Sequence, residues 1–87
     1  MNHFTLPRFW RHYDSLPQHI QQLADKDHAL LRDDPFHPSL HFKKVGNKKH
    51  LCSVRVGEHY RALGLDKSEP VFWFWIRTHA EYDKVLA

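Results

Sequence analysis

Two arginines flank a short turn in the second half of the chain and could bind an anion together. Arg55 and Arg61 stand on either side of residues 56–60, in a stretch typical of a β-hairpin. If the hairpin folds symmetrically about Glu58, the arginines lie opposite each other on one face. Like charges directly across a ladder repel, so this pair predicts an anion, such as phosphate, between them. The alternatives are two solvated side chains, neutralisation of one arginine by Glu58 or an aspartate, or a register shifted by one residue.

The segment 77–82, Arg-Thr-His-Ala-Glu-Tyr, combines side chains that could transfer protons. His79 and Tyr82 are three residues apart, so they share one face of a helix that begins here. Unpaired amides and the helix dipole favour an anion at such a start. Histidine is the usual general acid or base at neutral pH, and a tyrosine can act beside a cation that lowers its pKa. The alternative is a core tyrosine next to a surface histidine.

Four lysines surround one predicted strand and turn: Lys43, Lys44, Lys48 and Lys49. Lysines beside a groove provide salt-dependent affinity for phosphate that is independent of sequence. The alternative is a solvated surface, or charges that protect the edge of a sheet. Together with Arg77, these lysines are the candidates for binding a nucleic-acid backbone.

The nine histidines and the single cysteine do not predict a metal centre. His37 and His41 are four residues apart, but Pro38 lies between them, and no Cys/His pair has zinc-finger spacing. Cys52 cannot form an internal disulfide, which suits a reducing compartment. It reads as a small buried strand residue rather than a nucleophile. We therefore expect neither a metal nor a cofactor.

The elements that must position these residues fall into two groups. The first third of the chain predicts two helices, residues 5–16 and 17–34, with Thr5 as the first N-cap and Asp34-Pro35 as the end of the second. The rest predicts strands at residues 40–45, 50–56, 59–65 and 71–76. Thr78 and Glu81 then fit a capping box at the start of a last helix. This order predicts an α+β fold in which a helical hairpin packs on a four-stranded antiparallel sheet.

The strand at residues 71–76 is apolar on both faces, which is typical of a central strand covered on both sides. Strict alternation predicts two tryptophans on one face and three other apolar residues on the opposite face: Trp73 and Trp75, against Phe72, Phe74 and Ile76.

Length and composition limit the class of protein. The chain has 87 residues, which predicts one domain spanning residues 1–87. Apolar residues make up 41% and include six Phe, three Trp and three Tyr, so a core can form without disulfides. A net charge of +3 suits an anionic partner. We expect a cytoplasmic protein without a membrane span, because no signal peptide is recognisable and the longest apolar run is too short to cross a bilayer.

Several pieces of the chain together resemble the RelE/ParE superfamily of toxins from toxin–antitoxin systems. They are Phe4-Thr5, a helical hairpin containing Leu16-Pro17, the segment Arg55-Val56-Gly57 followed by Tyr60-Arg61, the apolar strand, and residues 78–83. The resemblance covers nearly the whole chain from about Phe4. Two departures stand out. Only residues 3–6 could form the first strand, and Ser53 stands where ribosome-cleaving members carry a lysine.

The resemblance implies a function and partners. Toxins of the RelE type cleave mRNA in the ribosomal A site without a metal, through attack of the RNA 2′-hydroxyl on the adjacent phosphate. By position, Arg61 would contact the phosphate, Arg55 would be a second cation, and His79 or Arg77 would stand at the helix start, with Tyr82 as the family tyrosine. The implied partners are a cognate acidic antitoxin, the ribosome and mRNA. The alternatives are a ParE-type toxin that inhibits DNA gyrase, or a non-catalytic binding module.

Overall fold

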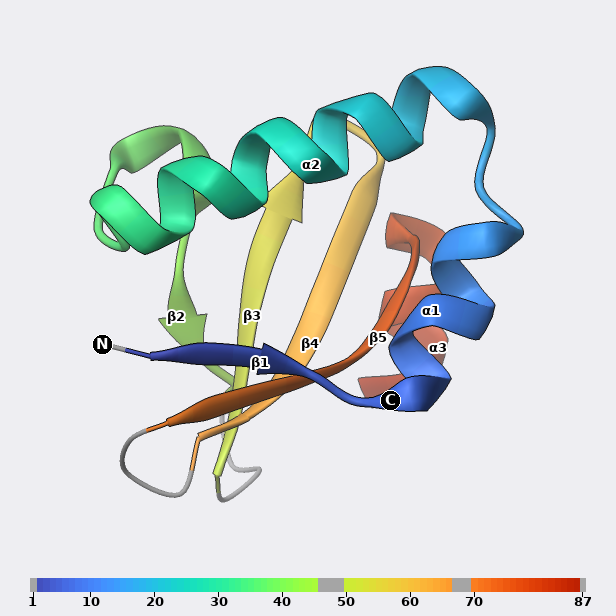
Figure 1. The fold of residues 1–87 in the computed structure, drawn as a ribbon. Helices are drawn as coiled ribbons and strands as arrows, with labels where there is room; N and C mark the ends of the chain where they lie inside the picture. Colours follow the sequence, from blue (N-terminus) through green and yellow to red (C-terminus); the bar gives the residue numbers. More distant parts are fainter. Residues whose placement is uncertain (1, 46–49, 67–69, 87) are drawn as a thin grey trace.

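The structure is a computed structural model that describes residues 2–45, 50–66 and 70–86 (Figure 1). In chain order its elements are β1 (His3–Thr5), α1 (Pro7–Asp14), α2 (Gln18–Asp33), the 3-10 turn η1 (Pro38–Leu40), β2 (Lys43–Lys44), β3 (Leu51–Val56), β4 (Tyr60–Asp66), β5 (Val71–Thr78) and α3 (His79–Leu86). Two helices thus precede the main strands and a short helix follows them, which confirms the predicted α+β class.

The sheet has five strands in the order β1-β5-β4-β3-β2. The four strands β2 to β5 pair antiparallel, as predicted. The fifth strand is β1, which runs parallel to β5 with Phe4 opposite Phe72. The pairing satisfies backbone groups that β5 would otherwise leave unpaired at a sheet edge: the amide of Val71 donates to the carbonyl of Asn2 over 2.9 Å. The short segment near the N-terminus therefore completes the sheet.

The strand predicted at residues 40–45 is much shorter in the structure. Pro38 begins the turn η1, which extends to Leu40, and His41 then adopts a left-handed backbone with φ of 48°. Proline suits the first position of such a turn because its ring presets φ. Only Lys43 and Lys44 remain extended and pair with β3.

Prolines lie at the starts of the first two helices and just beyond the end of the second. Pro7 occupies the first position of α1, and Pro17 directly precedes α2. The predicted N-cap Thr5 is wrong, because its hydroxyl accepts a hydrogen bond from the Trp10 indole over 3.0 Å and Leu6 takes the cap position. The second helix ends before Pro35, as predicted. No helix within the described ranges is long and apolar enough to cross a membrane.

Two clusters of buried side chains lie on opposite faces of the sheet. The larger one joins Ala24 and Leu31 of α2 to strand residues that include Val54 and Val56. The smaller one joins Tyr82 of α3 to a set of apolar residues: Val45, Leu63 and Trp75. Figure 1 shows the arrangement, with α2 crossing one side of the sheet and α3 behind it. The sheet is thus covered by helices on both faces.

A β-bulge separates the two tryptophans of β5. Leu63 lies opposite Trp75 and Gly64 lies opposite Trp73, so the register shifts by one residue and leaves Phe74 as the extra residue. Trp73 therefore packs in the larger cluster, whereas Trp75 packs in the smaller one. Ile76 joins Trp73 in the larger cluster. The prediction that both tryptophans share a face is wrong, because the bulge inverts the alternation along the strand.

Candidate functional site

Three arginines stand in one row across three neighbouring strands. Arg55 of β3 lies opposite Arg61 of β4, and Arg61 lies opposite Arg77 of β5. This register confirms the predicted opposition of Arg55 and Arg61, and it adds Arg77 on the other side. The next residues in register toward the sheet centre, Ser53 and Leu63, lie on the face covered by α3. We call Arg55, Arg61 and Arg77 the arginine row.

The charges of the arginine row are only partly neutralised. A nitrogen of Arg77 lies 2.5 Å from a carboxylate oxygen of Glu81. The Arg55 Nε instead donates to the carbonyl of Gly57, and an Arg61 Nη donates to the carbonyl of Tyr60, each over 2.9 Å. Within the described ranges, no carboxylate is within ion-pair distance of Arg55 or Arg61. Two adjacent guanidinium groups in the described part of the chain therefore have no carboxylate counter-charge, which favours a bound anion.

The start of α3 is held by the predicted capping box. The hydroxyl of Thr78 donates to a carboxylate oxygen of Glu81 over 2.9 Å, and the amide of Glu81 donates back to that hydroxyl over 3.2 Å. The bond from Thr78 is the main reason why the pKa of Glu81 is lowered, with Arg77 adding to the effect. Glu81 therefore stays ionised and ties the helix start to the end of the arginine row.

His79 and Tyr82 lie in contact on α3, but they differ in exposure. The rings stack with centroids 6.1 Å apart, and the His79 side chain is 49% exposed with its Nδ1 3.5 Å from a carboxylate oxygen of Asp83. Tyr82 is only 7% exposed, and its hydroxyl donates to the hydroxyl of buried Ser53 over 3.2 Å. His79 can therefore meet a ligand directly, whereas Tyr82 lies below it in the core.

The predicted lysines do not all lie on the face of the sheet that carries the arginine row. Lys43 lies opposite Ser53 and so shares the side of the sheet on which the arginine row begins. Lys44 lies opposite Cys52, on the other side, and forms an ion pair with Asp66. The structure thus brings Lys43, but not Lys44, to the face of the arginine row. The two further candidates, Lys48 and Lys49, lie outside the described residues.

One histidine near the site was not among the predicted residues. His12 of α1 lines a cleft of about 250 Å³ together with Arg77, Thr78 and Glu81. Burial lowers its pKa, and the charges of neighbouring arginines lower it further, with Glu81 opposing them. The sequence contained one indication of its position: His12 lies at helical spacing from the apolar residues Phe9 and Leu16.

Neither Cys52 nor the described metal-ligand side chains form a reactive site. Cys52 is fully buried, its thiol faces the carbonyl of Gly64 at 3.7 Å, and burial raises the pKa of the thiol to about 12. It is therefore not a nucleophile in the folded protein. Across residues 2–45, 50–66 and 70–86, no three His, Cys, Asp or Glu side chains gather as metal ligands.

Solved structures of toxins share the fold of this chain. The chain is similar to a chain in the crystal structure of the RelB–RelE antitoxin–toxin complex from Methanococcus jannaschii, with a TM-score of 0.76, 13% identity, and coverage of 97% of this chain and 99% of that one. It is also similar to a copper-bound mutant toxin from Helicobacter pylori, with a TM-score of 0.63, 14% identity, and coverage of 93% and 97%. No curated protein sequence matches the chain.

A family model identifies the chain more closely. The model of the ParE-like toxin domain matches residues 18–84, which is most of the chain. The chain therefore belongs to the ParE-like toxin domain family. This membership confirms the resemblance to the RelE/ParE superfamily that the sequence indicated, and it places the chain among the toxins of toxin–antitoxin systems.

Proposed function

We propose that this toxin cleaves mRNA on the ribosome, with the arginine row as its phosphate-binding site. The observation that carries the proposal is the row itself, because Arg55 and Arg61 lie side by side without a carboxylate partner among the described residues. Guanidinium groups suit a phosphate that gains charge on its non-bridging oxygens in the transition state. His79 stands beside the row at the start of α3, with half of its side chain exposed.

The proposed reaction is an internal transfer at one phosphate. A base takes the proton of the RNA 2′-hydroxyl, whose oxygen attacks the adjacent phosphorus. The bond from phosphorus to the 5′-oxygen breaks, and an acid donates a proton to that leaving oxygen. The products are a 2′,3′-cyclic phosphate and a 5′-hydroxyl. We assign one of these proton transfers to His79, because an imidazole changes protonation state near neutral pH.

The other candidates take supporting roles in this proposal. Tyr82 acts through His79, whose ring it stacks against, and through Ser53, to which its hydroxyl donates. Arg77 holds the helix start through Glu81. Lys43 adds salt-dependent attraction for the RNA backbone, and we extend the same role to Lys48 and Lys49.

We further propose that a cognate antitoxin binds and inhibits the toxin, and that both act in the cytoplasm. The similar structure from Methanococcus jannaschii is a complex of the toxin RelE with the antitoxin RelB. The net charge of +3 on this chain favours an acidic partner.

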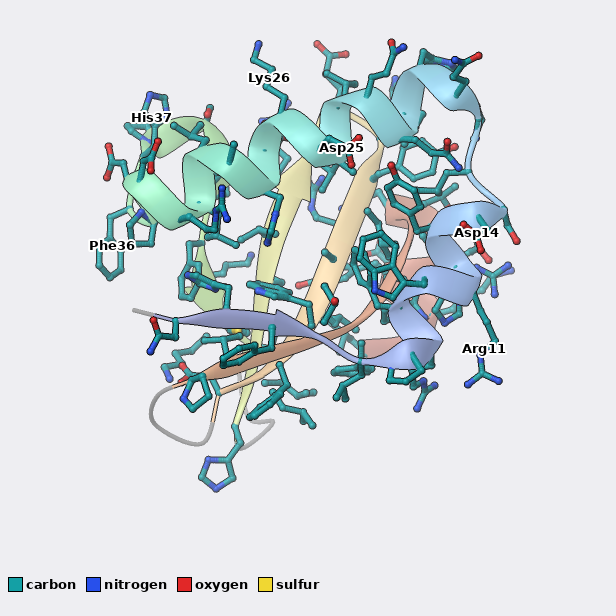
Figure 2. All side chains as sticks on the ribbon, viewed as in Figure 1. Arg11, Asp14, Asp25, Lys26, Phe36 and His37 are labelled. Carbon is teal, nitrogen blue, oxygen red and sulfur yellow. The ribbon has the colours of Figure 1, made fainter. Side chains whose placement is uncertain are left out.

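The test is cleavage of mRNA on purified ribosomes by the purified chain and its variants. Arg61→Ala and His79→Ala should each lower the cleavage rate by roughly 10²–10⁴-fold without unfolding the protein, because each removes a group that acts on the reacting phosphate. Arg11→Ala is the matched control, since Arg11 points outward from α1 (Figure 2). Full activity in both site variants would show that the nuclease site is elsewhere.

The second candidate is inhibition of DNA gyrase. The observation in its favour is the family itself, whose model is that of a ParE-like toxin domain. The same protein preparations should therefore be assayed for inhibition of DNA supercoiling by gyrase. Inhibition of gyrase by a chain that leaves ribosome-bound mRNA intact would replace the nuclease proposal with this one.

A further inference from the structure

A small cavity lies between the first two helices and the sheet, on the face opposite the arginine row. Its volume is about 60 Å³, and its floor consists of core side chains of the sheet: Val54, Val56, Ala62 and Ile76. One wall comes from α1 and the other from α2, which crosses this face of the sheet (Figure 1). Because one water needs about 10–15 Å³, the cavity has room for a group of roughly four or five heavy atoms.

The α1 wall of the cavity consists of aromatic rings set nearly at right angles. The Trp10 ring meets the Phe9 ring at 88° and the Tyr13 ring at 73°, with centroids 5.3 and 5.0 Å away. The indole of Trp10 donates to the hydroxyl of Thr5 over 3.0 Å. The hydroxyl of Tyr13 donates to a carboxylate oxygen of Asp25 over 2.8 Å. The polar ends of both rings are thus already bonded, so the rings offer the cavity their π surfaces, which attract cations.

The α2 wall supplies negative charge at the rim of the cavity. Asp25 and Asp27 both line it, and within the described ranges no cationic side chain lies within ion-pair distance of either carboxylate. The hydrogen bond to Asp25 is the main reason why the pKa of Tyr13 is raised, so the phenol stays protonated and the charge stays on the carboxylate. His28 lines the cavity too, but burial lowers its pKa, so it is neutral at neutral pH. The cavity is therefore acidic, although the whole chain carries +3.

The rim of the cavity is open to solvent, so a small molecule can enter without unfolding the hairpin. Trp10 is 46% exposed, and Asp25 is exposed as well. Figure 2 shows Asp25 at the edge of α2 that faces α1. Asp27 is half-buried, and burial raises its pKa. Asp25 is therefore the carboxylate that an entering ligand meets first.

The chemistry of the walls selects among small occupants. Water needs two to four polar partners, which the apolar floor does not provide. An uncharged apolar molecule fits the floor but leaves the carboxylate of Asp25 against a group that cannot pair with it. An anion is repelled by both aspartates. A cation whose charge is wrapped in methyl groups suits the floor, the rings and the carboxylate together.

We propose that this cavity binds a small organic cation with an alkylated ammonium head, such as free choline. Its methyl groups lie on the apolar floor, and its positive charge faces the rings of Trp10 and Tyr13 and the carboxylate of Asp25. A trimethylammonium head is of the size that the cavity admits. This binding lies on the opposite side of the sheet from the arginine row and does not rest on the proposed nuclease activity.

The test is a titration of the whole chain, followed by nuclear magnetic resonance of its amide and indole groups. The two probes are choline and its uncharged isostere, in which carbon replaces the nitrogen. We expect choline to bind with a dissociation constant on the order of 1 mM, as suits so small a head, and to shift the signals of Trp10 and Asp25. The isostere should bind roughly 2–30-fold more weakly, because it lacks the charge that the rings and the carboxylate attract.

Two variants separate the contribution of the ring from that of the carboxylate. Trp10→Leu keeps an apolar side chain but removes the ring, and should weaken choline by roughly 2–30-fold. Asp25→Asn should weaken choline and leave the isostere unchanged. Its amide oxygen can still accept the bond from Tyr13, so this variant keeps the test decisive if Trp10→Leu fails to fold. Asp14→Asn is the matched control, because it removes the same charge at the end of α1, away from the cavity (Figure 2).

Several outcomes would overturn the proposal. They are equal affinity for choline and the isostere, unchanged choline binding in both variants, shifts confined to the arginine row, or no shift at choline concentrations on the order of 50 mM. Vesicles of phosphatidylcholine present the same head group on a lipid, so binding of vesicles without binding of free choline would also contradict a free ligand. All titrations are done without RNA, so their result is independent of mRNA cleavage.

Discussion

At the scale of single residues, the buried pair Tyr82 and Ser53 links α3 to the sheet beneath the arginine row. Ser53 is 1% exposed, so its hydroxyl depends on the Tyr82 hydroxyl for a partner in place of water. The ring of the same tyrosine stacks against the ring of His79. A tyrosine at this position can therefore support a site without touching the substrate.

The substitution Tyr82→Phe separates this supporting role from direct catalysis. Loss of the hydroxyl leaves Ser53 without that bond and should lower the free energy of unfolding by about 1–3 kcal/mol. Cleavage should stay within a few-fold of the wild type, because the ring still packs against His79. The measurements are urea unfolding and the ribosome assay, and Ser53→Ala combined with Tyr82→Phe should restore part of the stability. A drop of roughly 10²-fold or more in cleavage would instead make the hydroxyl a proton-transfer group.

At the scale of elements, the bulge between β4 and β5 depends on Gly64. A Cβ at this position would lie 2.9 Å from a ring carbon of Trp73 and 2.9 Å from a methyl of Val71, both of which are buried. We predict that Gly64→Ala lowers the free energy of unfolding by about 1–3 kcal/mol, because an overpacked core must shift its side chains. Urea unfolding checks this, with Arg61→Ala on the same strand as the control that should change stability little. An unchanged midpoint in Gly64→Ala would mean that the packing around the bulge yields easily.

At the scale of the whole molecule, the burial of His12 near several arginines makes the stability of the fold depend on pH. The pKa of His12 lies below its ordinary value of 6.5, because of burial and then the charges of Arg77, Arg8 and Arg11, against which Glu81 acts. The folded state thus binds fewer protons than the unfolded state near pH 6.5. By linkage, the stabilisation is fully present above that pH and is lost as the pH falls through it.

We therefore expect a lower urea midpoint at pH 6 than at pH 8. His12→Gln should reduce the difference between the two midpoints, because it removes a group that must take up a proton on unfolding. His19→Gln, on the exposed side of α2, is the control and should leave the difference unchanged. Equal pH dependence in the wild type and His12→Gln would contradict this assignment.

Features that depend on neighbours along the chain were predictable from the order of residues. The opposition of Arg55 and Arg61 follows from a short turn in which Gly57 adopts a φ of 61°, so the residues that flank it fix the register. The capping box of Thr78 and Glu81 joins residues three apart. Such contacts join residues close in the chain, so their spacing indicated them, although the register of the hairpin was left open until the strands were seen to pair.

Which distant segments share a face depends on how the strands pair in the folded chain. Arg77 lies in the arginine row because β5 pairs with β4 in one particular register. Trp75 lies on the opposite face of the sheet from Trp73 because that register shifts at a bulge. The sequence could therefore name candidate residues, but it could not give their arrangement in space. A slip of one residue moves every side chain to the opposite face, and the packing that selects the register comes from helices distant in the sequence.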